Sequence, residues 1–262
     1  MSANVVSETN LESEYQYFFN SQIRSLKKKF EDRRIPVHSI ENKVELYQFI
    51  EQFLLERSYI NKISFSDSVT LYQLDVFNFI INKYSNEKDI FWPLERSNSG
   101  HYKIYGEQPK GRMNLPYETY MEKHTAWYEN IRNSQNCDLT IIGANAVTMN
   151  GEIVSVDGLG NRVSSMIFGP KHVLVIVGKN KIVKDVDSAL DRIHNFAAPM
   201  TYIRHANKHY TNHINLPCVQ KGKCFNCSFP ESACMNTVIV RGQIHHHADR
   251  IHLLIINENL GF

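Results

Sequence analysis

The stretch from Leu139 to Asp185 constrains the fold more than any other part of the chain. It contains His172 to Val177, in which Val, Leu and Ile follow one another without polar alternation. Such a run is typical of a strand that is buried on both faces, and a sheet of such strands needs helices on both sides. Two further strands are expected at Leu139 to Ile142 and at Glu152 to Val156. The stretch therefore predicts an α/β sheet.

Helical patterns lie on either side of this stretch. Residues 11–30 predict an amphipathic helix, whose apolar stripe is Tyr15, Phe19, Ile23, Leu26 and Phe30. A second helix is expected to begin at the N-cap Asp185 and to end at Pro199. The chain closes with two strands, Asn236 to Val240 and Ile251 to Ile256. The alternation of strands and helices favours βαβ units.

The chain is long enough to bury a substantial core, since 42% of its 262 residues are hydrophobic. We expect an N-terminal helical arm, residues 1–40, and one α/β domain, residues 41–262. Residues 94–113 lack periodicity, which is typical of a lid, a partner loop or a disordered excursion.

The net charge of +2 is too close to zero to suggest a protein that binds nucleic acids or membrane surfaces. No signal peptide is visible at Met1 to Asn4, and no apolar run approaches the roughly 20 residues that cross a bilayer. These observations predict a cytoplasmic protein without a nucleic-acid or membrane partner. In that compartment the five cysteines are expected to be reduced thiols or metal ligands.

The loop Asp157-Gly158-Leu159-Gly160-Asn161-Arg162 is the strongest candidate for a ligand site. Gly158 and Gly160 let the backbone approach a ligand, and the following helix presents unpaired amides to it. Arg162 could bind a carboxylate or phosphate through two hydrogen bonds, and Asp157 could take a hydroxyl or orient Arg162. The alternative is a glycine turn with a salt-bridged arginine, since the loop lacks the spacing of the dinucleotide fingerprint.

Asn145 and Lys181 follow the two apolar strands, so both are candidates to share a pocket with Arg162. Ser68 and Thr70 lie in a polar loop before a helix, where hydroxyls and amides form either an anion site or a plain N-cap. For Asn145 and Lys181 the alternatives are turn formation and a solvated ammonium.

Cys218, Cys224, Cys227 and Cys234 lie in one short segment, residues 214–236. Their spacing, C-x5-C-x2-C-x6-C, fits neither a zinc ribbon with two knuckles nor the ferredoxin pattern. An iron–sulfur cluster, structural zinc, and unmetallated thiols or an adventitious disulfide all remain open. Cys137, which lies outside this segment, is expected to be a small buried side chain.

Histidines form two groups. His205, His209 and His213 would share one helix face, where they could bind a divalent metal, move a proton or lie exposed. His245-His246-His247 is expected at an exposed hairpin tip between the last two strands. No H-E-x-x-H pattern, nucleophile elbow, P-loop or kinase motif is present, so no catalytic acid or base can be named.

Several of these motifs resemble the lactate-utilisation (LUD) domain family. The resemblance rests on Ile142 to Thr148, on the Asp157–Arg162 loop, on Phe168-Gly169-Pro170 and on Asn180 to Asp185. The segment Pro217 to Cys234 is similar to that of the short members. The resemblance to the family is strong from about residue 138 to the end of the chain and weaker over residues 43–136.

The resemblance implies a three-layer αβα fold with a mostly parallel sheet, similar to the NagB/RpiA/CoA-transferase group. It also implies a part in the conversion of L-lactate, or a related 2-hydroxy acid, to the keto acid, beside iron–sulfur and ferredoxin-like partners. This redox pathway favours an iron–sulfur cluster over zinc on the four cysteines. The chain departs from the family at Ser66-Asp67, where glycines are common and where a carboxylate would repel an anion.

The leading hypothesis is a LUD protein that binds a small anionic ligand at the Asp157–Arg162 loop. A metal centre on the cysteines would either fold the C-terminal segment or pass electrons. One alternative is a non-redox ligand-binding or regulatory protein with structural zinc. Another, by analogy of fold, is a transferase or isomerase that acts on a phosphorylated or thioester substrate.

Overall fold

The computed structural model describes residues 8–91, 94–96, 102–104, 125, 128–209, 212–228 and 232–262. Most of the loop expected at residues 94–113 lies outside these ranges. Within the loop, two described segments pair as a short antiparallel hairpin, β4 (Leu94–Arg96) and β5 (Tyr102–Ile104).

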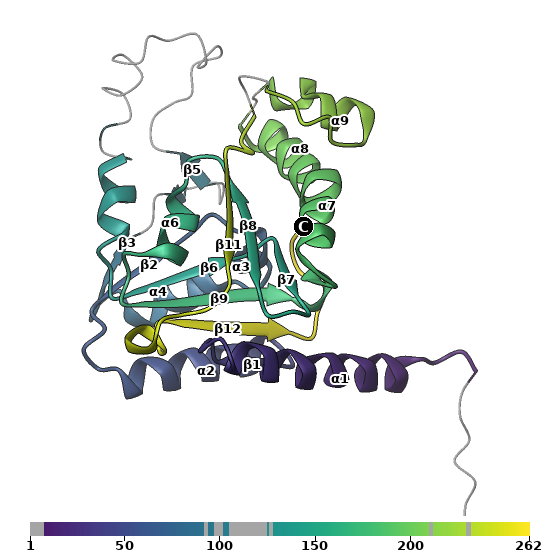
Figure 1. The fold of residues 1–262 in the computed structure, drawn as a ribbon. Coiled ribbons are helices and arrows are strands. Elements are labelled where there is room, and N and C mark those ends of the chain that lie inside the picture. Colours follow the sequence, from purple (N-terminus) through teal and green to yellow (C-terminus); the bar gives the residue numbers. More distant parts are fainter. Residues whose placement is uncertain are drawn as a thin grey trace, which may run out of the picture.

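The centre of the fold is a six-stranded sheet in the order β1-β12-β9-β6-β2-β3, and all of its neighbouring strands are parallel (Figure 1). Its strands are β1 (Val37–Ile40), β2 (Lys62–Phe65), β3 (Asp89–Phe91), β6 (Leu139–Gly143), β9 (His172–Gly178) and β12 (Ile251–Ile256). Every residue of β6, β9 and β12 is buried, as expected for strands covered on both faces. The α/β fold class is therefore confirmed.

Alternate residues of each central strand enter two separate cores. On one face, Leu174 and Ile176 pack with α2 (Lys43–Glu56), α3 (Val69–Gln73) and α4 (Val76–Tyr84). On the other face, Val173, Val175 and Val177 pack with α1 (Glu12–Glu31) and with residues of α6 (Asn161–Ile167). The period of two along each strand thus produces three layers.

The helix α1 confirms most of the expected apolar stripe. Phe19, Ile23, Leu26 and Phe30 are buried, whereas Tyr15 is 67% exposed. The chain then continues into β1, which lies within the segment expected as an N-terminal arm and pairs with β12 at the edge of the main sheet.

A second, four-stranded sheet has the order β10-β7-β8-β11, with strands β7 (Ala146–Thr148), β8 (Ile153–Asp157), β10 (Ile182–Val183) and β11 (Asn236–Val240). The strand expected at residues 152–156 forms β8, outside the parallel sheet. The reason is a tight turn in which the Thr148 hydroxyl and the Glu152 carboxylate contact each other and Gly151 adopts a φ of +87°. This turn makes β7 and β8 antiparallel.

The helix that follows Asp185 does not end at Pro199. Helix α7 (Val186–Arg192) continues through a π-helical turn (Ile193–Ala197) into α8 (Ala198–His209), and Figure 1 shows them as one column. Pro199 lies in the first turn of α8, next to the wider π turn, where a proline without an N–H is tolerated.

Short helices complete the described chain: η2 (Lys179–Lys181), η4 (Asn212–Asn215), α9 (Pro217–Lys221) and η5 (His245–His247). The three histidines of η5 are exposed, as expected. The prediction that they lie at the tip of a hairpin is wrong. The strands before and after it, β11 and β12, belong to different sheets. Among the described helices, none combines the length and the apolar character that crossing a bilayer requires.

Candidate anion-binding site

Three strands of the main sheet deliver polar residues to the same edge. Because β2, β6 and β9 are parallel neighbours, the residues that follow them meet at their carboxyl ends. These residues are Ser66 to Thr70 after β2, Ala144 and Asn145 after β6, and Lys179 to Lys181 after β9. The sequence predicted this meeting for Asn145 and Lys181.

Arg162 lies at this edge and contacts Asn145. Its Nη2 donates to the Val156 carbonyl at 2.7 Å and to Asn145 Oδ1 at 3.3 Å, and it lies 3.2 Å from Asp157 Oδ1. Asn145 Oδ1 also accepts from the Val156 amide at 2.9 Å. Arg162 Nε is buried and has no hydrogen-bond partner among the described residues. The arginine is therefore salt-bridged, as the alternative interpretation of the loop expected, and retains one unused donor.

The glycines of the loop approach protein rather than open space. Gly160 has a φ of +95°, and its amide donates to Asp157 Oδ2 at 2.8 Å, which closes the turn before α6. A Cβ on Gly158 would lie 2.8 Å from the Cβ of Ala233. Asn236 Nδ2 donates to the Gly158 carbonyl at 2.9 Å, so the loop is held against the cysteine segment. Asn161 begins α6 and is half-buried.

Lys181 is the most deeply buried cation of the site, with 4% of its surface exposed. Its Nζ donates to Thr70 Oγ1 at 2.9 Å and to the Ala144 carbonyl at 3.0 Å. Burial, followed by the charges of Arg192 and Arg162, lowers the pKa of Lys181 to about 7. The solvated ammonium that was the alternative for this residue is therefore excluded.

Arg192, at the end of α7, completes the site, and no sequence pattern indicated it. Its Nη1 donates to the Asn145 carbonyl at 3.0 Å, and burial lowers its pKa. No local pattern connects Arg192 with a residue 47 positions earlier. We refer to Arg162, Lys181 and Arg192 as the cation cluster. All three bind the Ala144-Asn145 dipeptide, and among the described residues only Asp157 forms an ion pair with them.

The polar loop after β2 lies beside the cluster. Ser68 occupies the N-cap position of α3 without a side-chain capping bond, and a Cβ on Gly143 would lie 2.5 Å from its Oγ. Ser66 Oγ is buried and has no hydrogen-bond partner among the described residues. Asp67 is exposed, so its carboxylate does not occupy the buried part of the loop.

Lys181 is the enclosed member of the cation cluster, whereas Arg162 and Arg192 are partly exposed. The C-terminal segment, residues 258–262, lies against Lys181, and a Cβ on Gly261 would lie 3.1 Å from its Nζ. A surface cleft of about 480 Å³ lies elsewhere, beside the first turns of α1, Lys179 and Asn257, and no cluster residue lines it. A ligand therefore needs this covering segment to move before it reaches Lys181.

The four cysteines of the C-terminal segment do not form a cluster, but their charges influence one another. Besides burial, the charges of Cys227 and Cys234 raise the pKa of Cys218, and those of Cys224 and Cys227 raise the pKa of Cys234. All are free thiols, and no three lie within 4.8 Å of one another.

Tyr202 of α8 holds the end of this segment. The Tyr202 hydroxyl lies 3.1 Å from Cys234 Sγ and accepts from the Ala233 amide at 2.7 Å. Away from the segment, Cys137 is 2% exposed, and burial raises its pKa to about 11, as expected for a small buried side chain.

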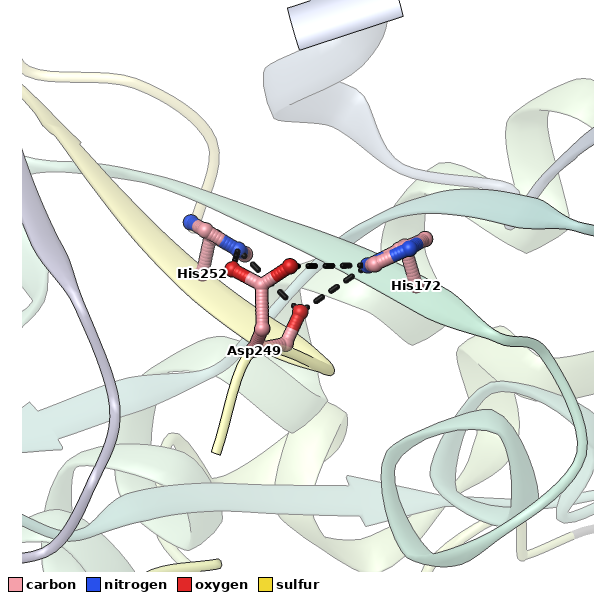
Figure 2. A group of neighbouring side chains, drawn as sticks. All are labelled: His172, Asp249 and His252. Atoms are coloured by element: carbon pink, nitrogen blue, oxygen red, sulfur yellow. Dashed lines mark hydrogen bonds and ion pairs between the residues drawn. The ribbon is translucent and has the colours of Figure 1, made fainter. Parts of the chain in front are cut away.

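A second cluster of polar side chains, which the sequence analysis did not predict, lies at the amino ends of β9 and β12, opposite the cation cluster. Figure 2 shows His172, Asp249 and His252, whose nitrogen and carboxylate atoms lie within 4.8 Å of one another. His172 Nδ1 lies 2.9 Å from the Asp249 carbonyl, and His252 Nε2 lies 3.0 Å from its carboxylate. The three residues come from the start of β9 and from the turn into β12. With His38 of β1 we call them the histidine network.

The hydrogen bonds fix the protons of the histidine network. A carbonyl oxygen only accepts, so His172 Nδ1 carries a proton and its Nε2 accepts from the Tyr59 hydroxyl at 2.6 Å. His252 Nε2 likewise donates to Asp249, while its Nδ1 accepts from His38 Nε2 at 3.2 Å. A metal needs lone pairs at these same nitrogens. As arranged, the network is therefore a complete set of hydrogen bonds between neutral rings rather than a metal site.

The other predicted histidine group cannot be assessed as a unit. His205 is half-buried on α8. The side chains of His209 and His213 lie outside the described residues, so a role for the three together stays a prediction.

The LUD domain family matches residues 23–256, which is most of the chain. The chain belongs to the LUD domain family. A search of curated proteins found no match. Among solved structures, this LUD protein is similar to a DUF162 family protein from Deinococcus radiodurans. The two share 10% sequence identity and a TM-score of 0.40 over 93% of this chain and 97% of the other.

Proposed function

We propose that this LUD protein takes part in the oxidation of L-lactate, or of a related 2-hydroxy acid, to the keto acid. In this proposal the small anionic substrate binds at the cation cluster. Family membership supports the pathway. The binding site is supported by a single observation: three basic side chains converge on Ala144-Asn145, and among the described residues only Arg162 is paired with a carboxylate, that of Asp157.

Charge explains why an anion suits this position. Burying cations without counter-charges is unfavourable, and a carboxylate ligand would relieve the repulsion among them. Arg162 Nε and Ser66 Oγ are buried donors without partners among the described residues, so they offer hydrogen bonds that the protein does not use. Arg192 and Arg162 are the residues expected to bind the carboxylate, because a guanidinium forms charge-assisted bonds with it.

Calorimetric titration of the full chain with L-lactate, pyruvate and oxamate tests the binding site. We expect binding of at least one of these, and at least roughly tenfold weaker binding by Arg192→Gln, because one charge-assisted hydrogen bond contributes about 1.5–3 kcal/mol. Arg241→Gln, at an exposed arginine, is the matched control and should bind normally. Equal affinity in Arg192→Gln, or binding of only sugar phosphates or acyl-CoA, would contradict the proposal.

We also propose that Cys218, Cys224, Cys227 and Cys234 hold an iron–sulfur cluster. A single zinc with Zn–S bonds of about 2.3 Å needs thiolates about 3.8 Å apart in a tetrahedron. No three of these thiols lie within 4.8 Å of one another, yet the charges of Cys227 and Cys234 raise the pKa of the Cys218 thiol. A cluster of several irons fits this wider spacing better than one ion. When bound, it would supply one-electron transfer to a ferredoxin-like partner.

Anaerobic purification, with iron, sulfide and zinc assays and a visible spectrum, tests the metal proposal. We expect a brown protein with iron and sulfide, and loss of both in Cys218→Ser. Cys137→Ser should keep them, since Cys137 is buried apart from the segment. A colourless protein with one zinc per chain would instead support a non-redox, regulatory LUD protein.

A further inference from the structure

Lys181 has an environment that suits a reactive amine better than a structural ion pair. Its two hydrogen-bond partners, Thr70 Oγ1 and the Ala144 carbonyl, are both uncharged. Among the described residues, no carboxylate lies within 4.0 Å of its Nζ. A lysine buried to 4% exposure without a counter-ion is unusual, because such residues are almost never buried unless they are paired.

The surroundings leave about half of this amine uncharged near pH 7. Burial and the charges of Arg192 and Arg162 all act in the same direction and bring the pKa of Lys181 to about 7. Desolvation and a neighbouring cation are the two means by which a lysine becomes a nucleophile towards carbonyl compounds. Lys179, two residues earlier, differs because its Nζ donates to the Asn257 side chain.

The covering segment shields the same amine from water. Gly261 has a φ of +64°, and a side chain there would clash with Thr70 Oγ1 and approach Lys181 Nζ. The segment is held by the Leu260 amide, which donates to Asn180 Oδ1, and by the Gly261 amide, which donates to Gln73 Oε1. A covalent product formed beneath it would be protected from hydrolysis.

We propose that Lys181 condenses with the carbonyl carbon of a 2-oxo acid to form an imine. The Nζ–C bond forms, the C–O bond breaks, and the carbonyl oxygen leaves as water with the two protons of the amine. The carboxylate of the acid faces Arg192 and Arg162. This inference rests on the proposed function, in which a 2-oxo acid is the product. An imine of pyruvate also acidifies the methyl protons, so Lys181 would catalyse their exchange with solvent.

Reductive trapping tests the inference. The full chain is incubated with pyruvate and sodium cyanoborohydride, and the adduct is located by intact mass and peptide mapping. We expect one adduct, at Lys181, whose rate of formation rises with pH and is half-maximal near pH 7. Lys181→Arg should form none, whereas Lys179→Arg should form it normally. L-lactate, which has a hydroxyl in place of the keto group, should give no adduct.

Proton exchange gives a second readout that needs no reductant. In D2O, NMR should show loss of the pyruvate methyl signal at least roughly tenfold faster with wild type than with Lys181→Arg, which equals about 1.4 kcal/mol. Binding of pyruvate without an adduct or exchange would overturn the imine and leave the anion site intact. An adduct elsewhere would also overturn it. Absence of both binding and adduct would overturn the imine and the proposed function together.

Discussion

The Arg57 guanidinium donates two hydrogen bonds to the Asp249 carboxylate, at 3.1 and 3.0 Å. The pair joins the end of α2 to the turn before β12, across 192 residues of sequence. Arg57 also lies over the Phe53 ring, 4.0 Å from its centroid, and its side chain is 16% exposed. The same carboxylate accepts from His252, so one residue links the helix layer to the histidine network.

Removing this carboxylate should destabilise the protein. Asp249→Ala leaves Arg57 with only the longer contact to the Glu56 carboxylate, at 3.5 Å, and leaves His252 Nε2 with only a backbone carbonyl. We expect a loss of about 1–2 kcal/mol in the free energy of unfolding, because Asp249 itself is 61% exposed and the pair is partly screened. Urea unfolding measures it. Glu51→Ala, which removes an exposed pair with Lys83, is the control and should leave the free energy of unfolding essentially unchanged.

The histidine network should make the protein sensitive to acid. Burial lowers the pKa of His172 and His252, and lowers that of His38 to about 4. Since an unfolded histidine has a pKa near 6.5, the unfolded state binds more protons below that pH. The contribution of the neutral histidines to the free energy of unfolding should therefore be fully present above about pH 6.5 and should be lost as the pH falls towards 4. The charged and titratable groups that face the network are Lys27, Arg57, Tyr59, Asp249 and Arg250.

Thermal unfolding between pH 7.5 and 4.5 measures this effect. Between these two pH values the free energy of unfolding should fall by about 2 kcal/mol less in His38→Gln than in wild type, after allowance for the partial exposure of His38. His246→Gln, at an exposed histidine of η5, should behave as wild type. An acid loss of equal size in His38→Gln would show that carboxylates elsewhere cause it.

Lys181→Met should stabilise the protein near neutral pH. The variant loses two hydrogen bonds but removes a buried amine beside two guanidiniums, and we expect a net gain of about 1 kcal/mol. The folded pKa, about 7, lies below the unfolded value of 10.5, so wild-type stability should rise between pH 7 and 10.5. Urea unfolding across that range should show a smaller rise in Lys181→Met. The same slope in both proteins would contradict the assignment.

Tyr202→Phe should weaken retention of the proposed iron–sulfur cluster without unfolding the domain. The variant leaves the Ala233 amide without its acceptor and removes the hydroxyl beside Cys234, which frees the end of the cysteine segment. We expect iron per chain to fall at least roughly twofold, and stability by about 1 kcal/mol. Tyr17→Phe, at a tyrosine that is 72% exposed, is the control. Unchanged iron content would mean that Tyr202 does not position the ligands.

Local patterns predicted the elements well and their partners poorly. The apolar runs at Leu139 and His172 became β6 and β9, since a strand buried on both faces leaves a clear signature. The placement of β8 in a second sheet depends on a turn at Gly151 and on pairing with a strand some 80 residues later. Such pairing has no local signal.

In the candidate site, too, the residues with a local sequence signal were predictable and those brought in by long-range contacts were not. Asn145 and Lys181 were predictable because each follows a strand of the parallel sheet. Arg192 was not, because it reaches the site from α7 and looks like any basic residue in a last helical turn. The histidine network was equally hidden, since His38 and His252 are 214 residues apart and each is a single histidine within an apolar strand.

The contact between Gly158 and Ala233 means that these two positions share the space of a single methyl group. Gly158→Ala alone forces the turn and the cysteine segment apart, whereas Gly158→Ala together with Ala233→Gly moves the methyl from one side to the other. The two changes should therefore compensate each other, and related chains are free to exchange them only as a pair.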